Sequence, residues 1–562
     1  MQMNPEQVAI VRSPAKRILA ICGAGSGKSR TLVERIRQNI ADGADPAKIL
    51  AISYTQAAAR VMQERLGDIR LGACSTLHAF LLRLIGEHHA RLGLPETISV
   101  FDDDNQEALV ETIMAEMGVK VPVSKVMPLL ELAAMINPTK GISRTKPELV
   151  AIEFHSRLRQ GGLLSFDSIL FYGHQVIRQL ADCDQWKYTH FYGDEWQDAA
   201  IIDCQIVEAM PCEYKFLVGD TDQKIMGFRG ACDWLEQTAL AAPGNGWTVF
   251  NLEKNYRCRA AIAAAAQNLI SHNVGRFPKV TSPVHEGGEV TVTRCGSPAS
   301  ELSHVLTQIQ AAIATGAAEA SGIAILARTN ALARQFADHL KAMGIPVAER
   351  RYQEVPADWK TAKAFLTVLA NRYNDMAVHN YLVLASGKPF ADKMRQTAAV
   401  KMVALYEVAL PQLKGADGKA PVAELGIAGI SAESRERVHD ACRLLSANGG
   451  WTINDLILYL NADANRETKG EGVSILTGHQ SKGREFRHVH IVGFEEGLFP
   501  MLRKDSVLEE DRRLAYVCIT RAMETVSISY CESRPKPFSR EMVECKPSRF
   551  IAEAGISNAK AS

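Results

Sequence analysis

The stretch RILAICGAGSGKS, residues 17–29, decides how this chain folds. Its first part, RILAIC, is a short apolar run of the kind that forms a buried strand in a parallel sheet. Its second part is a glycine-rich loop from Cys22 to Ser29, and a helical pattern begins near Ser29. Backbone N–H groups of such a loop can converge on phosphate oxygens at the N-terminus of a helix. The stretch therefore predicts an α/β fold that contains a phosphate-binding loop.

The loop residues have distinct expected tasks. Lys28 would reach the β- and γ-phosphates of a nucleotide, and the Ser29 hydroxyl would ligate Mg²⁺. The strict pattern has glycine at the first position, where this chain has Cys22. An ordinary glycine turn between a strand and a helix is the alternative interpretation. The positions expected to surround the phosphates are Cys22, Gly23, Ala24, Gly25, Ser26 and Gly27.

An acidic motif, HFYGDEWQD at residues 190–198, supplies what a phosphate-binding loop needs. Asp194 ends an apolar run and would hold Mg²⁺, directly or through water. Glu195 beside it is placed to orient and deprotonate an attacking water molecule. Alone, such a pair of acids is often only a charge at a helix N-terminus. Together, the two motifs indicate a nucleoside triphosphatase.

The composition excludes several classes of protein. The chain has 562 residues, 47% hydrophobic and 23% charged, which predicts roughly three or four globular domains rather than a disordered or fibrous protein. The 64 Lys+Arg residues balance the 63 Asp+Glu residues, so no overall basic field points to a partner. We see no secretion signal and no apolar run near the ~20 residues of a membrane span, which favours a cytoplasmic protein without a membrane partner. The cysteines are scattered without the spacing of a metal site.

Short apolar runs alternate with helical patterns in two separate sets. This alternation predicts two α/β domains with parallel sheets, and two helical stretches interrupt them. The expected division is a first domain at 1–98 and 165–257 with a helical insertion at 99–164, and a second domain at 258–386 and 471–562 with a shorter helical insertion at 387–470.

From Asn4 to Ala522 the chain resembles the UvrD/Rep-type superfamily 1 DNA helicases. The resemblance lies in a series of motifs in the order of that family, and outside the two insertions it covers nearly all of the chain. Besides the two motifs above, these are NPEQ (4–7), AISYTQAAARVMQERL (51–66), STLHAF (75–80), LSFDSIL (164–170), VGDTDQKIMGFRGA (218–231), NYR (255–257), ILARTNALARQFADHLKAMGIPV (325–347), HQSKGREF (479–486), GFEEGLFP (493–500) and RRLAYVCITRA (512–522). The resemblance implies two RecA-like P-loop motor domains that use ATP and Mg²⁺.

The resemblance also adds residues to the nucleotide site. Arg257 and Arg521 resemble two arginine fingers, which approach from the second domain and neutralise charge in the transition state. The other implied positions are Gln7 for adenine, Arg30 beside the base, Glu485 on the ribose side and Gln223 as the sensor of the γ-phosphate.

In this family, DNA bases stack on aromatic side chains along a groove that crosses both domains. Tyr54 and Phe228 occupy such aromatic positions, and Arg229 follows Phe228. The positions that match contacts to phosphate or sugar are Thr55, Thr76, His78, Arg328, Asn330, His479 and Lys482. The implied partners are single-stranded DNA and junctions between single and double strands.

The chain departs from the family pattern at several positions. Met226 stands where the family often has a stacking tyrosine, which weakens one base platform. Gln56 and Ala57 replace the usual Asn-Lys pair, so one expected contact to the DNA backbone lacks its usual residues. Gly193 replaces a bulky residue, and Trp196 replaces phenylalanine or tyrosine.

The resemblance implies an ATP-dependent DNA helicase of repair, recombination or replication that moves 3′ to 5′ along single strands. A second hypothesis is a DNA-sensing ATPase subunit of a nuclease or phage-defence complex with little unwinding of its own, which the short insertions favour. The protein partner would be a nuclease or a repair factor. An ATP-binding module without hydrolysis is disfavoured, because Lys28, Glu195 and the two arginines are present.

Overall fold

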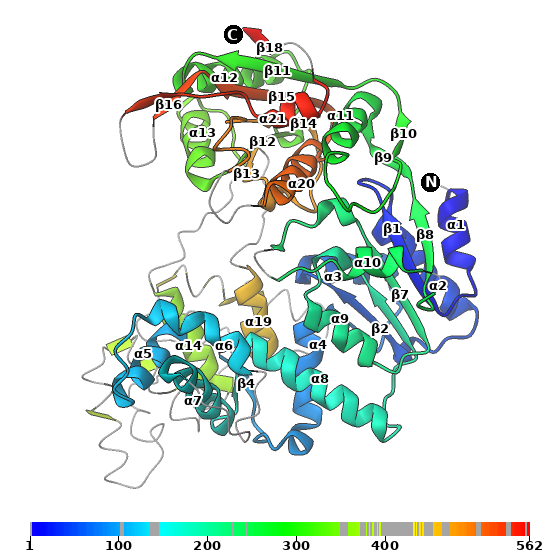
Figure 1. Cartoon of the computed structure of the whole chain (residues 1–562), viewed down its shortest axis with the longest axis vertical. Coiled ribbons are helices and arrows are strands. Elements are labelled where there is room, and N and C mark those ends of the chain that lie inside the picture. Colours follow the sequence, from blue (N-terminus) through cyan, green and yellow to red (C-terminus); the bar gives the residue numbers. More distant parts are fainter. Residues whose placement is uncertain are drawn as a thin grey trace.

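Two sheet-centred halves and a group of helices make up the computed structural model (Figure 1). It describes residues 3–101, 106–134, 145–227, 230–242, 244–348, 358–370, 453–463, 472–501, 507–535, 541–556 and 559–561, and separate short pieces between 378 and 442. No helix within these ranges is long and apolar enough to cross a membrane.

The first sheet has six parallel strands in the order β3-β2-β6-β7-β1-β8. They are β1 (Arg17–Cys22), β2 (Ile49–Ser53), β3 (Ala73–Thr76), β6 (His190–Gly193), β7 (Tyr214–Gly219) and β8 (Thr248–Leu252). Alternate residues of a strand face opposite sides of a sheet, so each face has its own core. One face is covered by α1 (Pro5–Arg12), α2 (Lys28–Ala41) and α3 (Gln56–Leu66), and the other by α4 (Leu77–Glu87), α8 (Phe166–Asp182), α9 (Ile201–Ala209) and α10 (Trp234–Leu240).

The parallel order gathers the loops that follow the strands at one edge. In the register, Ile21 of β1 lies beside Gly219 of β7, and Ile52 of β2 lies beside Gly193 of β6. The carboxyl ends of these strands therefore meet at the same edge, which is where open α/β sheets bind ligands.

A helical insertion lies between α4 and α8. Its helices are α5 (Gln106–Glu116), α6 (Met127–Ala134) and α7 (Lys146–Gln160). The short strands β4 (Ser99–Val100) and β5 (Leu163–Leu164) pair in parallel where the chain enters and leaves the insertion. A core of its own, with Phe101 and Phe154 in edge-to-face contact, holds these helices together.

The second sheet repeats the architecture, with six parallel strands in the order β13-β12-β14-β15-β11-β18. They are β11 (Glu289–Cys295), β12 (Ile323–Ala327), β13 (Ser474–Thr477), β14 (Phe486–Ile491), β15 (Ala522–Cys531) and β18 (Ala559–Ala561). One face is covered by α11 (Ala260–Ile270), α20 (Leu508–Ile519) and α21 (Arg549–Glu553), and the other by α12 (Pro298–Ala314) and α13 (Asn330–Ala342). The hairpin strands β16 (Ser533–Pro535) and β17 (Met542–Glu544) follow β15.

Two further parallel strands, β9 (Lys254–Arg259) and β10 (Ser282–His285), join the halves. β9 leaves the first sheet directly after β8 and leads into α11 of the second half. The domain boundary expected at residue 257 falls inside β9, so this strand is the joint itself.

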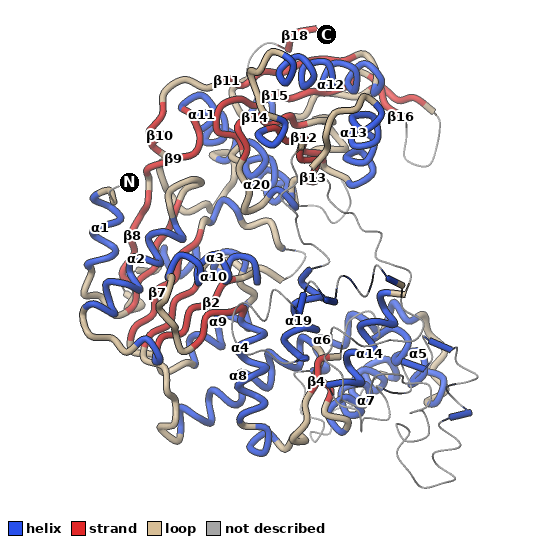
Figure 2. The backbone as a smooth tube through the Cα atoms, turned by 180° about the vertical axis from the view of Figure 1, so that it is seen from behind, coloured by secondary structure: helices blue, strands red, loops and turns tan. Residues whose placement is uncertain are grey.

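The helices α14 (Trp359–Ala370) and α19 (Ile453–Asp463) pack on each other and on β4, beside the first insertion (Figures 1 and 2). Asn454 Nδ2 donates a hydrogen bond to the carbonyl oxygen of Ile98 at 2.6 Å. The buried Phe365 and Leu366 of α14 belong to the same core as the helices on the first sheet. α14 precedes the insertion expected at 387–470 and packs with the first half of the chain, and the bounds of that insertion stay a prediction.

A buried ionic cluster lies at the end of β15. Arg534 Nη2 donates to Glu301 Oε2 at 2.7 Å and to Glu495 Oε1 at 2.8 Å, and both glutamates are 1% exposed. With Cys531, the two glutamates form a group whose ligand atoms are close enough to hold a metal ion. The Arg534 guanidinium already forms ion pairs with both carboxylates, so we interpret the cluster as structural.

We expect Arg534→Met to lower the free energy of unfolding by about 3–5 kcal/mol, because it leaves two buried carboxylates without a counter-charge. Thermal and urea unfolding of the full chain measure this loss. The control is Arg549→Met, whose side chain is 45% exposed in its ion pair with Glu496, and which should cost only about 0–1 kcal/mol. Equal losses in both variants would contradict the structural role of the cluster.

Candidate active site

The phosphate-binding loop leaves β1 at the carboxyl edge of the first sheet, and α2 begins at Lys28. Gly25 and Gly27 have φ angles of 68° and 82°, which residues with side chains rarely adopt. A Cβ atom at Gly25 would also lie 2.6 Å from the Cβ of Arg257. The loop therefore needs glycine both for its turn and for its close contact with β9.

Lys28 and Ser29 face the acidic pair at the end of β6. The Lys28 ammonium lies 2.9 Å from Glu195 Oε2, and Ser29 Oγ donates to Asp194 Oδ2 at 3.0 Å. The Lys28 and Glu195 side chains are 12% and 26% exposed, so water screens their attraction only partly. The structure thus brings together the two motifs that lie 165 residues apart in the sequence.

The pKa values of Asp194 and Glu195 shift in opposite directions. Burial, followed by the charge of Glu195, raises the pKa of Asp194 above its usual range. Burial acts in the same direction on Glu195, but the Lys28 and Lys482 ammonium groups outweigh it and hold the pKa of Glu195 below its usual range. Burial alone would lower the pKa of Lys28, whereas the surrounding carboxylates raise it above its usual value. Glu195 is therefore an ionised carboxylate beside a protonated Lys28 at neutral pH.

Glu195 has an unusual backbone, and its side chain is oriented by Gln197. Its φ angle is 54°, a left-handed conformation that non-glycine residues adopt at a cost and that is frequent at functional sites. Gln197 Nε2 donates to Glu195 Oε2 at 2.6 Å, and Gln197 Oε1 accepts from the Asp220 backbone N–H at 3.0 Å. Gln197 therefore connects the acidic pair to the end of β7, a task that its place in the DEWQD motif does not reveal.

Gln223 connects the two halves of the chain. Its Nε2 donates to Asp220 Oδ2 at 2.6 Å, which orients the amide, and its Oε1 accepts from Arg521 Nη2 at 3.1 Å. Arg521 follows α20 of the second half and is only 1% exposed. Burial, followed by the charge of Arg257, lowers the pKa of Arg521 to about 10, so the guanidinium remains a cation at neutral pH.

Arg257, on β9, lies beside the segment that carries Arg521. Its Nε donates to Glu485 Oε2 at 3.0 Å, and its Nη1 donates to the Thr520 carbonyl oxygen at 3.3 Å. The buried Asn255 holds this turn, because its Oδ1 accepts from the backbone N–H groups of Arg257 and Cys258, each at 2.9 Å. The first residue of the NYR motif is thus a positioning residue for the arginine.

The start of α1 lies against the other side of the loop. Gln7 N–H donates to Asn4 Oδ1 at 2.7 Å, and Asn4 N–H donates to Gln7 Oε1 at 3.1 Å, a reciprocal N-terminal cap. Gln7 Nε2 donates to the Ser26 carbonyl oxygen at 3.2 Å. Asn4 Nδ2 donates to Tyr256 Oη at 2.9 Å, so an aromatic residue that the sequence did not single out adjoins this end of the site. Arg30 lies in the first turn of α2 and is half-buried.

A second buried ionic cluster lies behind the loop and was not expected from the sequence. Lys279 Nζ donates to the Cys22 carbonyl oxygen at 2.9 Å and forms ion pairs with Asp220 and Asp222. Arg276 donates two hydrogen bonds to Asp222 at 2.7 and 2.8 Å. The cluster fastens the segment between α11 and β10 to the edge of the first sheet.

The residues expected to contact DNA lie at the carboxyl edges of both sheets. Strands β2 and β3 are in register at their ends, as are β12 and β13, which brings the following residues together in two groups. The first group is Tyr54, Thr55, Thr76 and His78, and the second is Arg328, Asn330, His479 and Lys482. In the second group, Gln480 Nε2 donates to Asn330 Oδ1 at 3.3 Å.

The threonines and histidines of these groups carry no positive charge that could attract a phosphate. The Thr55 and Thr76 hydroxyl oxygens cap the N-termini of α3 and α4. Burial lowers the pKa of His78 to about 4. Burial, followed by two nearby cations, lowers the pKa of His479 to about 4. Both histidines are therefore neutral near pH 7 and can offer only neutral hydrogen bonds.

Lys482 and Arg328 have carboxylate partners. The Lys482 ammonium contacts Asp198 and donates to the Gln223 carbonyl oxygen at 2.8 Å. Arg328 Nη2 donates to Asp511 Oδ1 at 3.0 Å. Lys482 therefore contacts the first half of the chain, and the phosphate contacts expected for Lys482 and Arg328 would compete with these carboxylates.

Two departures from the family pattern compensate for each other. A Cβ atom at Gly193 would lie 2.7 Å from the Trp196 ring and 2.7 Å from Leu217 Cδ2. The Trp196 indole therefore occupies the space that a bulky residue before Asp194 would need. Its ring also packs edge-on against Phe191, with centroids 5.8 Å apart.

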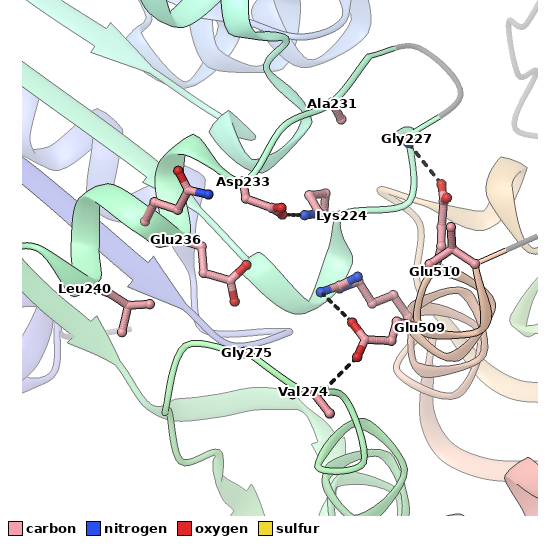
Figure 3. Close-up of a pocket in the computed structure, with 13 residues that line it drawn as sticks. Lys224, Gly227, Ala231, Asp233, Glu236, Leu240, Val274, Gly275, Glu509 and Glu510 are labelled. Atoms are coloured by element: carbon pink, nitrogen blue, oxygen red, sulfur yellow. Dashed lines mark hydrogen bonds and ion pairs between the residues drawn. The ribbon is translucent and has the colours of Figure 1, made fainter.

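Phe228 and Arg229 lie outside the described residues, so the base platform stays a prediction. The described parts of their loop border a pocket of about 380 Å³, opposite the start of α20 (Figure 3). Glu510 Oε1 accepts from the Gly227 backbone N–H at 3.0 Å across this pocket. The loop is thus attached to the helix that Arg521 follows.

The comparison with protein families gives two adjacent matches. The UvrD/REP helicase N-terminal domain matches residues 3–234, and the UvrD-like helicase C-terminal domain matches residues 250–404 and 451–533. The chain is 28% identical to DNA helicase II of Salmonella typhimurium, over 98% of this chain and 87% of the relative. It is 27% identical to a probable DNA helicase II homolog of Rickettsia conorii, over 98% and 95%, and 26% identical to the ATP-dependent DNA helicase PcrA of Staphylococcus epidermidis, over 98% and 86%. The chain therefore belongs to the UvrD/REP helicase family and is an ATP-dependent DNA helicase.

Proposed function

We propose that this helicase uses Mg²⁺-bound ATP to move 3′ to 5′ along single-stranded DNA in the cytoplasm and opens duplex at single-strand/double-strand junctions. The observation that carries the proposal is the contact of Arg521 with Gln223, which joins the second half of the chain to the phosphate site of the first. The direction of movement rests on the family to which the chain belongs.

The residues at the end of β6 fit a magnesium ion. Ser29 Oγ and Asp194 Oδ2 lie 3.0 Å apart and are oxygen donors, which Mg²⁺ prefers. The pKa of Asp194 is raised because burial and the charge of Glu195 outweigh the attraction of Lys28, so a further cation there would be favourable. Ser26 Oγ, in the adjoining loop, is buried without a hydrogen-bond partner and is available to a phosphate oxygen. When bound, Mg²⁺ would neutralise charge on the phosphates.

In the proposed mechanism, different residues of this chain have different roles in ATP hydrolysis. Lys28 would exchange its contact with Glu195 for the β- and γ-phosphates, which frees the Glu195 carboxylate to accept a proton from the attacking water. Gln223 is proposed to sense the γ-phosphate. The guanidinium groups of Arg257 and Arg521 would neutralise the negative charge that develops in the transition state.

The proposed DNA path follows the carboxyl edges of both sheets. Tyr54 on the first edge and Asn330 on the second would contact the same DNA strand. A change in the distance between the sheets would therefore change the distance between these two DNA contacts. Closure of the cleft by nucleotide, and its release after hydrolysis, would convert that change into movement. The Glu510 contact with Gly227 supports this coupling, because it links α20 to the loop that carries Phe228.

A strand-displacement experiment tests the proposal. Duplexes with a 3′ tail, a 5′ tail or blunt ends are incubated with the protein, ATP and Mg²⁺, and ATP hydrolysis is measured on the matching single strands. We expect displacement of the 3′-tailed duplex only. Displacement from the 5′ tail would overturn the direction. Strong DNA-stimulated hydrolysis without displacement would favour the DNA-sensing ATPase, which would then need a nuclease or repair factor as partner.

We expect Glu195→Gln to reduce kcat for ATP by about 10²–10⁴-fold, because the amide cannot accept the proton of the attacking water. The affinity for ATP should persist, since Lys28 and the loop remain. Steady-state hydrolysis and equilibrium nucleotide binding measure the two effects, with Glu213→Gln as the control at an exposed glutamate. A normal kcat would show that Glu195 is not the base.

We expect Arg257→Ala to lower kcat by ~10³-fold or more while KM for ATP changes little, because the lost charge acts mainly in the transition state. Arg259→Ala is the matched control, since that arginine of the same strand donates to the Glu286 carbonyl oxygen, away from the cleft. Kinetics of both variants with saturating single-stranded DNA provide the test. A rise in KM at constant kcat would make Arg257 a ground-state binding residue.

A further inference from the structure

Two cysteines lie side by side behind the nucleotide site. Cys204 belongs to α9 and is 1% exposed, and Cys232 ends the loop after Gln223 and is half-buried. The backbone holds these segments together, because Cys232 N–H donates to the Ala199 carbonyl oxygen at 3.0 Å and Ala200 and Ala231 form an antiparallel bridge. The two side chains lie close enough for each to shift the pKa of the other. The two sulfur atoms are therefore neighbours in the reduced protein, in which all twelve cysteines are free.

The two thiols differ in their pKa values. The interaction with Cys204 is the main cause that lowers the pKa of Cys232 to about 6. The Trp234 backbone N–H and the Lys224 ammonium act in the same direction, whereas burial and Asp203 oppose it. The same interaction, together with burial, raises the pKa of Cys204. Cys232 is therefore the thiolate that solvent can reach, and Cys204 is a protonated thiol held against it.

We propose that Cys204 and Cys232 form a redox site that a peroxide closes to a disulfide. The Cys232 thiolate attacks one oxygen of hydrogen peroxide, so an S–O bond forms, the O–O bond breaks and hydroxide leaves. The Cys204 sulfur then attacks the Cys232 sulfenic acid, the S–O bond breaks, and the thiol proton leaves with the hydroxyl group as water. Two thiols and one peroxide give one disulfide and two water molecules.

The disulfide would join two segments that serve different ligands. Cys204 lies in α9, the helix that follows the Glu195 turn. Cys232 ends the loop that begins at Gln223 and includes Phe228 in the sequence. Tethering that loop to α9 should prevent it from responding to DNA. This consequence rests on the proposed role of the loop in DNA binding, whereas the thiol chemistry does not.

Peptide mapping of the full-length protein tests the chemistry. The reduced protein is treated with hydrogen peroxide, free thiols are alkylated, and tryptic peptides are analysed by mass spectrometry without reduction. We expect peptides 188–215 and 230–254 to appear as one species, lighter than their sum by two hydrogen atoms. Since Cys212 shares the first peptide, fragmentation must place the bond at Cys204, and Cys212→Ser must leave it intact.

Serine variants decide between this site and general oxidation. Cys204→Ser and Cys232→Ser should each abolish the linked species, whereas Cys183→Ser, at an exposed cysteine, should not. In Cys204→Ser we expect the sulfenic acid of Cys232 to persist and to react with dimedone. Unlinked peptides after peroxide, or a bond at Cys212, would overturn the proposal.

A separate measurement tests whether the disulfide reduces the response of the protein to DNA. We expect peroxide to reduce the stimulation of ATP hydrolysis by single-stranded DNA severalfold, to leave hydrolysis without DNA unchanged, and to be reversed by dithiothreitol. The Cys204→Ser/Cys232→Ser variant should keep its stimulation under peroxide. If the untreated wild-type protein shows no stimulation by DNA, the proposed DNA role fails. A disulfide that leaves stimulation unchanged would instead overturn the coupling of the redox site to DNA.

Discussion

The buried contact between Arg521 and Gln223 is the constraint on which the rest of the site depends. A guanidinium that is 1% exposed must find partners for its donors, or its burial would be too costly. Its partner Gln223 is oriented by Asp220, and Asp220 is in turn fixed by Gln197 and Lys279. Since Gln197 also binds Glu195, one chain of polar contacts runs from the second half of the molecule to the residue proposed to activate water.

The same contact is the basis of the proposed link between ATP and DNA. Arg521 follows the C-terminus of α20, and Glu510 at the start of that helix holds the Gly227 backbone N–H of the loop opposite. A helix transmits displacement between its ends because its backbone hydrogen bonds keep it rigid. In the proposed mechanism, a shift of Arg521 on nucleotide binding would therefore also move Glu510. The loop between Gln223 and Cys232 is therefore held by α20 on one side and by α9 on the other, and a disulfide at Cys232 would strengthen one of these attachments.

The local signals in the sequence predicted most of the fold, but not the packing between distant segments. The apolar strands β1, β2 and β12 and the glycine-rich loop were predictable because a buried parallel strand has a continuous apolar run. The strands β3 (ACST) and β8 (TVFNL) lack such a run, and α14 has an apolar face that does not say which surface it covers. Asn255, Gln197 and Lys279 could not be assigned either. Lys279, for instance, contacts Asp220 at a separation of 59 residues, and a single lysine carries no local signal.

A double-mutant cycle on kcat tests most directly whether Arg521 and Gln223 act as one unit. ATP hydrolysis with saturating single-stranded DNA is measured for Arg521→Lys, for Gln223→Ala and for the double variant. In a control cycle, Gln237→Ala replaces Gln223→Ala, because Gln237 is an exposed glutamine of α10. Residues that act as a unit are strongly non-additive, so the double variant should be about as slow as the slower single variant, and the control cycle should be additive. Additive losses for Arg521 and Gln223 would contradict a shared role in joining the two halves.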